Sequence, residues 1–121
     1  MTNLDKQREM GRLAGERWPA LRNSFASFFH VDADVESPEI TLREMVQAWQ
    51  PGYRRAGLET LLAEWTDWAE ASADWEEGYL VDFIEFGFGA TWMIPDGAAA
   101  RRFMKSAHDA IVAGIAEEGE Q

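Results

Sequence analysis

The sequence predicts an all-α protein, a compact single-domain bundle of about five helices. Apolar residues recur at helical spacing along most of the chain, and helix-capping or helix-breaking residues separate these periodic segments. The length of 121 residues is a common size for one domain and is sufficient to bury a hydrophobic core. Neither an internal repeat nor a linker divides the chain.

Residues 1–17 form a charged N-terminal extension, which is expected to be either a helix or a flexible segment, and residues 18–121 form the helical domain. Trp18-Pro19 predicts the start of the first domain helix, because proline is tolerated at the first helical position. The next apolar residues follow the i, i+4, i+7, i+8 spacing of one buried face: Leu21, Phe25, Phe28 and Phe29.

The second helix has two possible starts. Thr41 and Glu44 have the spacing of a capping box, in which each side chain satisfies the backbone N–H of the other residue. Ser37-Pro38 is the competing start. The predicted buried stripe consists of Leu42, Met45, Val46 and Trp49, and Pro51-Gly52 ends the helix.

The third helix is predicted from about residue 53 to residue 71. Its apolar arc consists of Leu58, Leu61, Leu62, Trp65, Ala69 and Ser72. Glu59, Asp67 and Glu70 lie on the opposite face, with Glu64 and Trp68 on one flank. A tryptophan beside a carboxylate face suits an anchor for a partner, although it also suits the edge of a core.

The fourth helix is expected to open with a capping box from Asp74 to Glu77 and to be buried, because it is apolar on almost every side up to Phe86. Gly87-Phe-Gly89 predicts its end. Asp96 is expected to cap the last helix, from about residue 98 to residue 117. The buried stripe of that helix consists of Phe103, Met104, Ala107, Ile111 and Ile115.

The charge of the chain is concentrated in its middle. The net charge is −11, and the stretch between Arg55 and Arg101 holds ten carboxylates, four of the six tryptophans and no lysine or arginine. Such a one-sign field favours a positively charged partner and disfavours nucleic acid or an anionic membrane. Ordinary solubilising surface is the simpler alternative. The candidate partner-binding residues are Glu59, Glu64, Asp67, Trp68, Glu70, Asp74, Glu76 and Glu77.

The motifs of common enzymes and metal sites are absent from the sequence, so we expect no enzymatic activity and no cofactor. The one candidate for a metal-dependent enzyme is the segment His30-Val-Asp32-Ala-Asp34-Val-Glu36. It fails the calcium-loop pattern, because Ser37 and Arg43 occupy the positions of the required glycine and glutamate. The chain has no cysteine, its N-terminus is polar, and no apolar run reaches about 20 residues, so a cytoplasmic location is expected.

Two segments resemble the immunity proteins of bacterial contact-dependent growth inhibition systems. The first is Leu21-Arg-Asn-Ser-Phe-Ala-Ser-Phe-Phe-His30-Val-Asp32-Ala-Asp34, where an aromatic–aromatic–His–x–Asp segment follows an amphipathic helix. The second is Phe83-Ile-Glu85-Phe-Gly87, which leads into Trp92-Met-Ile-Pro95-Asp96-Gly97 and a closing helix. The resemblance covers about residues 18–115. The charged extension before Trp18 departs from the family pattern.

The resemblance implies a small cytosolic protein that binds and neutralises the C-terminal toxin domain of a large exported effector. Many such toxins are nucleases, so the acidic face is expected to cover a basic groove that holds phosphates. The motif residues Phe29, His30, Asp32 and Asp34 are expected to be structural. The alternative function is an adaptor or chaperone-like module that binds another basic protein.

Overall fold

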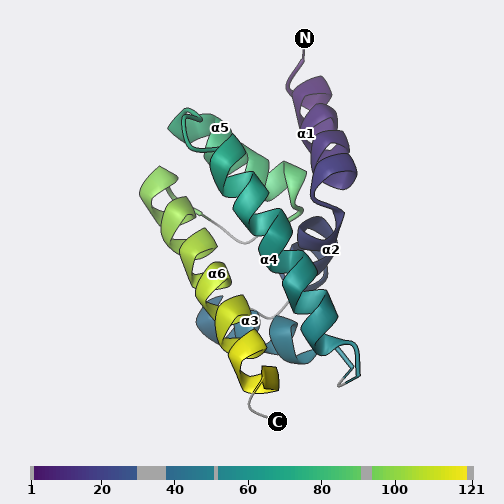
Figure 1. Cartoon of the computed structure of the whole chain (residues 1–121). Helices are drawn as coiled ribbons and strands as arrows, with labels where there is room; N and C mark the ends of the chain where they lie inside the picture. Colours follow the sequence, from purple (N-terminus) through teal and green to yellow (C-terminus); the bar gives the residue numbers. More distant parts are fainter. Residues whose placement is uncertain (1, 30–37, 51, 91–93, 120–121) are drawn as a thin grey trace.

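The described part of the chain is almost entirely helical, which confirms the predicted all-α class (Figure 1). The computed structural model describes residues 2–29, 38–50, 52–90 and 94–119. Within these ranges there are six α-helices, one π-helical turn and no strand: α1 (Asn3–Arg17), α2 (Pro19–Phe28), α3 (Pro38–Gln47), α4 (Arg54–Ala71), α5 (Glu77–Asp82), η1 (Phe83–Gly87) and α6 (Gly97–Gly119).

Helix α4 is the central element of the bundle. It packs against α6 on one side and against α2 on the other (Figure 1). Helix α3 lies against α6, and α1 packs mainly against η1 and then against α2. A helix covered on two sides buries more of its surface than one apolar stripe. Some residues of the predicted acidic face of α4 therefore lie against other helices instead of facing solvent.

Aromatic side chains from α2, α4 and η1, and from residues that directly flank α2 and η1, form the core between the α1–α2 junction, α4 and η1. Phe88 lies at its centre, with ring centroids 5.2 Å from Phe83, 5.5 Å from Phe25, 6.1 Å from Trp68 and 6.2 Å from Trp18. All five side chains are almost completely buried. The tilted and edge-to-face geometries are those that aromatic pairs prefer.

The charged N-terminal extension is a helix over Asn3–Arg17. Thr2 and Asp5 form a capping box at its start, with 3.2 Å from the Asp5 amide to Thr2 Oγ1. Met10 and Ala14 are buried in the main core. The extension therefore belongs to the same packed unit as the rest of the described bundle.

Two of the predicted capping boxes are wrong. Helix α3 begins at Pro38, as the competing start at Ser37-Pro38 predicts, so Thr41 lies inside the helix and is buried. Helix α5 begins at Glu77 with Glu76 as its N-cap, so Asp74 lies before the cap and Glu77 is the first helical residue instead of the third. In both places the residue types matched a capping box, but the chain enters the helix at a different residue.

Other predicted helix boundaries are confirmed. Pro19 is the first residue of α2. Asp96 Oδ1 accepts a hydrogen bond from the Ala99 amide at 2.8 Å, as a helix cap does. The predicted fourth helix is instead α5 followed by η1, whose π-type bond joins the Phe88 amide to the Phe83 carbonyl at 3.0 Å. Gly89, with φ of 71°, supplies the predicted left-handed residue after it.

Candidate functional site

The predicted partner-binding residues separate into three groups in the structure. One is a core residue, several hold the helices together, and the others are exposed to solvent. Trp68 is only 1% exposed, and its ring centroid lies 6.2 Å from those of Trp65 and Trp75. Trp68 is therefore a core residue and not an exposed anchor, because the flank of α4 that carries it is covered by aromatic side chains.

Asp67 and Glu64 tie α4 to the corner where α1 meets α2. Asp67 Oδ2 accepts hydrogen bonds from Arg17 Nε at 2.9 Å and from Trp18 Nε1 at 2.8 Å. The hydrogen bond from Arg17 makes the largest contribution to lowering the pKa of Asp67, and the hydrogen bond from Trp18 lowers it further. Glu64 Oε1 accepts from the Leu21 amide at 3.0 Å and so satisfies a free N–H in the first turn of α2.

The other predicted acids of α4 and α5 also differ in role. Glu77 Oε1 accepts from the Gly97 amide at 2.7 Å and so joins the start of α5 to the start of α6. Glu59 is exposed and pairs with Arg55 at 3.0 Å, one turn earlier on α4. Glu70, Asp74 and Glu76 are exposed and form no ion pair with any other described residue. The exposed acidic surface is thus smaller than the sequence pattern predicts.

Two of these exposed acids line a hollow that we call the acidic cleft. It lies between α1 and the turn from α4 to α5, and it encloses about 510 Å³. Its lining residues are Leu13, Arg17, Trp18, Ala71, Asp74, Trp75, Glu76 and Tyr79.

The acidic cleft combines carboxylates with aromatic rings. The rings of Trp75 and Tyr79 meet edge to face with centroids 4.9 Å apart, and Tyr79 is 39% exposed. Arg17 is the one cation in the lining, and it is held by Asp67 and lies 5.0 Å from the centroid of the Trp18 ring. Carboxylates beside accessible rings are a suitable environment for the guanidinium or ammonium group of a partner.

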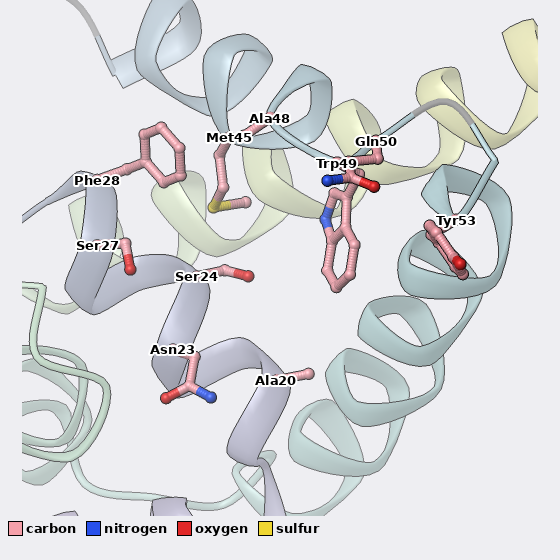
Figure 2. A pocket seen from close by; sticks show the side chains of 10 residues that line it. All are labelled: Ala20, Asn23, Ser24, Ser27, Phe28, Met45, Ala48, Trp49, Gln50 and Tyr53. Carbon is pink, nitrogen blue, oxygen red and sulfur yellow. The ribbon is translucent and has the colours of Figure 1, made fainter.

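A second hollow, which we call the neutral groove, lies between α2, the end of α3 and the start of α4. It encloses about 540 Å³, and side chains from α2, from α3 and from the connection between α3 and α4 converge on it (Figure 2). None of its lining residues is charged: Ala20, Asn23, Ser24, Ser27, Phe28, Met45, Ala48, Trp49, Gln50 and Tyr53. Trp18 lines the acidic cleft and Ala20 lines the neutral groove, but the other lining residues of the two hollows lie toward opposite ends of α4.

The neutral groove was not predicted from the sequence. The sequence pattern predicts that Phe28 and Trp49 belong to buried stripes, but both are only partly buried. Tyr53 is 69% exposed. The available signal was this tyrosine, a large aromatic residue directly after the helix-breaking Pro51-Gly52.

Of the four family-motif residues, only Phe29 lies in the described ranges. It is fully buried, and its ring centroid is 5.0 Å from that of Phe103, so it has the expected structural role. His30, Asp32 and Asp34 lie outside the described residues, as does the rest of the candidate metal segment. Elsewhere in the described part of the chain, no three histidine or acidic side chains are grouped closely enough to hold a metal ion.

His108 is partly buried on α6. Its ring centroid lies 4.6 Å from that of Trp65, and Nδ1 is 3.2 Å from Asp109 Oδ1. Over the described ranges, no helix combines the length and the apolar character needed to cross a bilayer. Comparison of the chain with protein-family models, with curated proteins and with solved structures finds no match.

Proposed function

We propose that this protein is an immunity protein of a contact-dependent growth inhibition system. It binds the C-terminal toxin domain of the cognate effector in the cytoplasm and prevents the toxin, a nuclease, from reaching its substrate. The protein itself is not an enzyme and uses no cofactor. The proposal rests on the family resemblance of two sequence segments and on one structural observation, the acidic cleft.

The acidic cleft supports the proposal because its exposed acids are not neutralised by the described residues around them. Asp74 and Glu76 lie beside the rings of Trp75 and Tyr79, and Glu70 is exposed in the last turn of α4. A nuclease presents lysine and arginine side chains to bind phosphates. One such side chain enters the acidic cleft, where carboxylates and aromatic faces replace the phosphate and the water around it.

Neutralisation follows from charge and position. The net charge of −11 attracts a basic domain at long range, and electrostatic steering raises association rates up to about 10⁸–10⁹ M⁻¹s⁻¹ at low salt. Once bound, the acidic surface covers the basic residues that would otherwise hold nucleic acid. The contact residues are Glu70, Asp74 and Glu76, whereas Glu64, Asp67 and Glu77 act indirectly by holding the helices in place.

The test is co-expression with the C-terminal domain of the protein encoded immediately upstream. Growth of a sensitive strain should be rescued by the wild-type chain, and the two proteins should co-purify as a complex of one copy each. The double variant Asp74→Lys/Glu76→Lys should rescue growth less well at matched expression levels. A wild-type chain that neither rescues growth nor binds this domain would refute the proposal. Several partners bound with similar modest affinity would point to the adaptor function instead.

A further inference from the structure

We propose that the acidic cleft selects an arginine of the partner over a lysine, and that the rings of Trp75 and Tyr79 make this selection. The inference rests on the proposed function, because it concerns the side chain that a basic toxin domain inserts there. Charge attraction alone does not distinguish the two residues. The selection is therefore assigned to the aromatic wall of the cleft, formed by Trp75 and Tyr79.

The charge balance of the acidic cleft favours a cationic ligand. Asp74 and Glu76 line it, are exposed and form no ion pair with any other described residue. The one cation in the lining, Arg17, is already paired with Asp67, with 2.9 Å between Nε and Oδ2. A cationic side chain that enters the cleft therefore meets two carboxylates that no neighbouring cation compensates.

The composition of the lining favours an organic cation over a metal ion. In the part of the chain that the structure describes, no three histidine or acidic side chains come close enough together to hold a metal. Hard divalent cations need several oxygen ligands, whereas arginine and lysine bring an apolar stem of their own. The other lining residues suit such a stem, because all are apolar or aromatic: Leu13, Trp18, Ala71, Trp75 and Tyr79.

The aromatic wall is fixed by the core behind it. The centroid of the Trp75 ring lies 4.8 Å from that of Phe83, 6.2 Å from that of Trp68 and 6.4 Å from that of Trp18, and these three side chains are almost completely buried. Tyr79 meets Trp75 at 4.9 Å and 83°, and it is 39% exposed, so part of its surface is free to contact a partner. A wall that is ordered before binding keeps the entropic cost of binding low.

Aromatic rings beside carboxylates distinguish a guanidinium from an ammonium group. A guanidinium is planar and weakly hydrated, so it stacks on a ring while its N–H groups bond to carboxylates in its own plane. An ammonium group is more strongly hydrated and loses more on contact with a ring. The cleft contains an internal example, since Arg17 lies 5.0 Å from the centroid of the Trp18 ring and donates to both carboxylate oxygens of Asp67. The acidic cleft offers a second guanidinium the same combination of indole and carboxylate.

The experiment uses two peptides of equal charge, acetyl-Gly-Arg-Gly-amide and acetyl-Gly-Lys-Gly-amide, as probes. Each is titrated into the isotopically labelled full-length protein, and the indole N–H signals are followed by NMR. The net charge of −11 attracts both peptides equally, so a difference in affinity reports the side chain alone. The arginine peptide should shift the Trp75 signal and bind with a Kd roughly 3- to 30-fold lower than that of the lysine peptide.

Two kinds of variant separate the carboxylates from the aromatic wall. Asp74→Asn/Glu76→Gln should weaken both peptides, because it removes the charge that either cation needs. Tyr79→Leu keeps an apolar side chain but removes the ring, so the preference for arginine should shrink. Tyr53→Leu, at the other tyrosine of the chain and 69% exposed, is the matched control and should leave the preference unchanged. The comparison of the two peptides on the wild-type chain decides the inference even where a variant does not fold.

The outcomes separate this inference from the proposed function. Equal affinities of the two peptides, no detectable binding of the arginine peptide, or shifts confined to tryptophans other than Trp75 would each overturn the selection of arginine. The proposed function would stand in all three cases as long as the wild-type chain rescues growth. A clear arginine preference without growth rescue or toxin binding would refute the immunity function and leave an arginine-selective cleft for another basic partner.

Discussion

The carboxylate of Asp67 on α4 accepts a hydrogen bond from the indole N–H of Trp18, with 2.8 Å between Oδ2 and Nε1. Trp18 is fully buried at the junction of α1 and α2, and a buried N–H that lacks an acceptor is destabilising. Arg17 binds the same carboxylate from the solvent side. The sequence pattern places Asp67 on a partner-binding face, but in the structure its carboxylate links the junction of α1 and α2 to α4.

Replacing Asp67 should destabilise the fold. Asp67→Ala removes the acceptor for Trp18 and leaves Arg17 without its partner, so the melting temperature should fall clearly below that of the wild type. Glu70→Ala, at an exposed position on the same helix, is the control and should change the melting temperature by no more than about 3 °C. Equal melting temperatures for the two variants would show that the hydrogen bonds of Asp67 contribute nothing to stability.

The contribution of Asp67 should depend on pH. Its pKa in the folded protein is lowered by Arg17 and Trp18, so folding is favoured by ionisation of this group. This stabilisation should be complete well above the unfolded pKa of about 3.9 and be lost as the pH falls through the lower, folded pKa. Urea unfolding of the wild type and Asp67→Asn should differ at pH 7 and converge near pH 2. A constant difference across this range would contradict the assignment.

Arg101 should stabilise the protein by capping the C-terminal end of α4. Its guanidinium donates to the Ser72 carbonyl oxygen at 2.6 Å and lies 5.8 Å from the centroid of the Trp68 ring. Arg101→Met should lower the free energy of unfolding by about 1–3 kcal/mol, because a carbonyl at a helix end loses a charged donor. Arg102→Met makes the same chemical change at the exposed neighbouring position and should have little effect in the same chemical denaturation experiment.

Gly57→Ala should be destabilising although alanine favours helices. The added methyl group would overlap the Trp49 ring, and such overpacking typically costs about 1–3 kcal/mol, more than the gain in helix propensity of about 0.5–1 kcal/mol. Gly78→Ala is the matched control, because a β-carbon there meets no atom within 4 Å and the propensity gain is retained. Denaturant titration should therefore shift the two midpoints in opposite directions.

The sequence was sufficient to predict most helices of residues 18–121, since their periodicity depends on local spacing, but it left α1 open between a helix and a flexible segment. It was not sufficient to predict how many sides of each helix are covered. Leu58 and Leu61 are buried as predicted, but Trp68 on the flank of the same helix is buried too, because α4 lies between α6 and α2. A hydrophobic stripe shows the best-covered face of a helix, while the burial of a flank depends on tertiary packing.

The candidate site depends on tertiary packing even more than the burial of α4 does, so the sequence predicts less of it. Net charge along the chain counts Glu64, Asp67 and Glu76 as equivalent, yet two of them are tied to the α1–α2 corner and only Glu76 is exposed in the acidic cleft. The contacts of Asp67 span about fifty positions of sequence, as in its 50-residue separation from Arg17. No local pattern contains that information. The neutral groove is lined by α2, α3 and the connection between α3 and α4, so a local pattern does not predict it either.

Charge reversal in the acidic cleft should slow association without unfolding the protein. Glu76 is exposed, forms no ion pair with the described residues and, as the N-cap of α5, makes no side-chain capping hydrogen bond. Glu76→Lys therefore removes steering charge at only a small cost, that of a positive charge at the start of a short helix. Association with the upstream-encoded toxin domain should slow several-fold at 50 mM salt, and the difference should vanish near 1 M, where the screening length is about 3 Å. Glu117→Lys makes the same change of charge in the last turns of α6, at the opposite end of the molecule from α5 (Figure 1), and controls for net charge. Equal slowing by both variants in stopped-flow measurements would mean that only total charge matters and that the acidic cleft is not the contact.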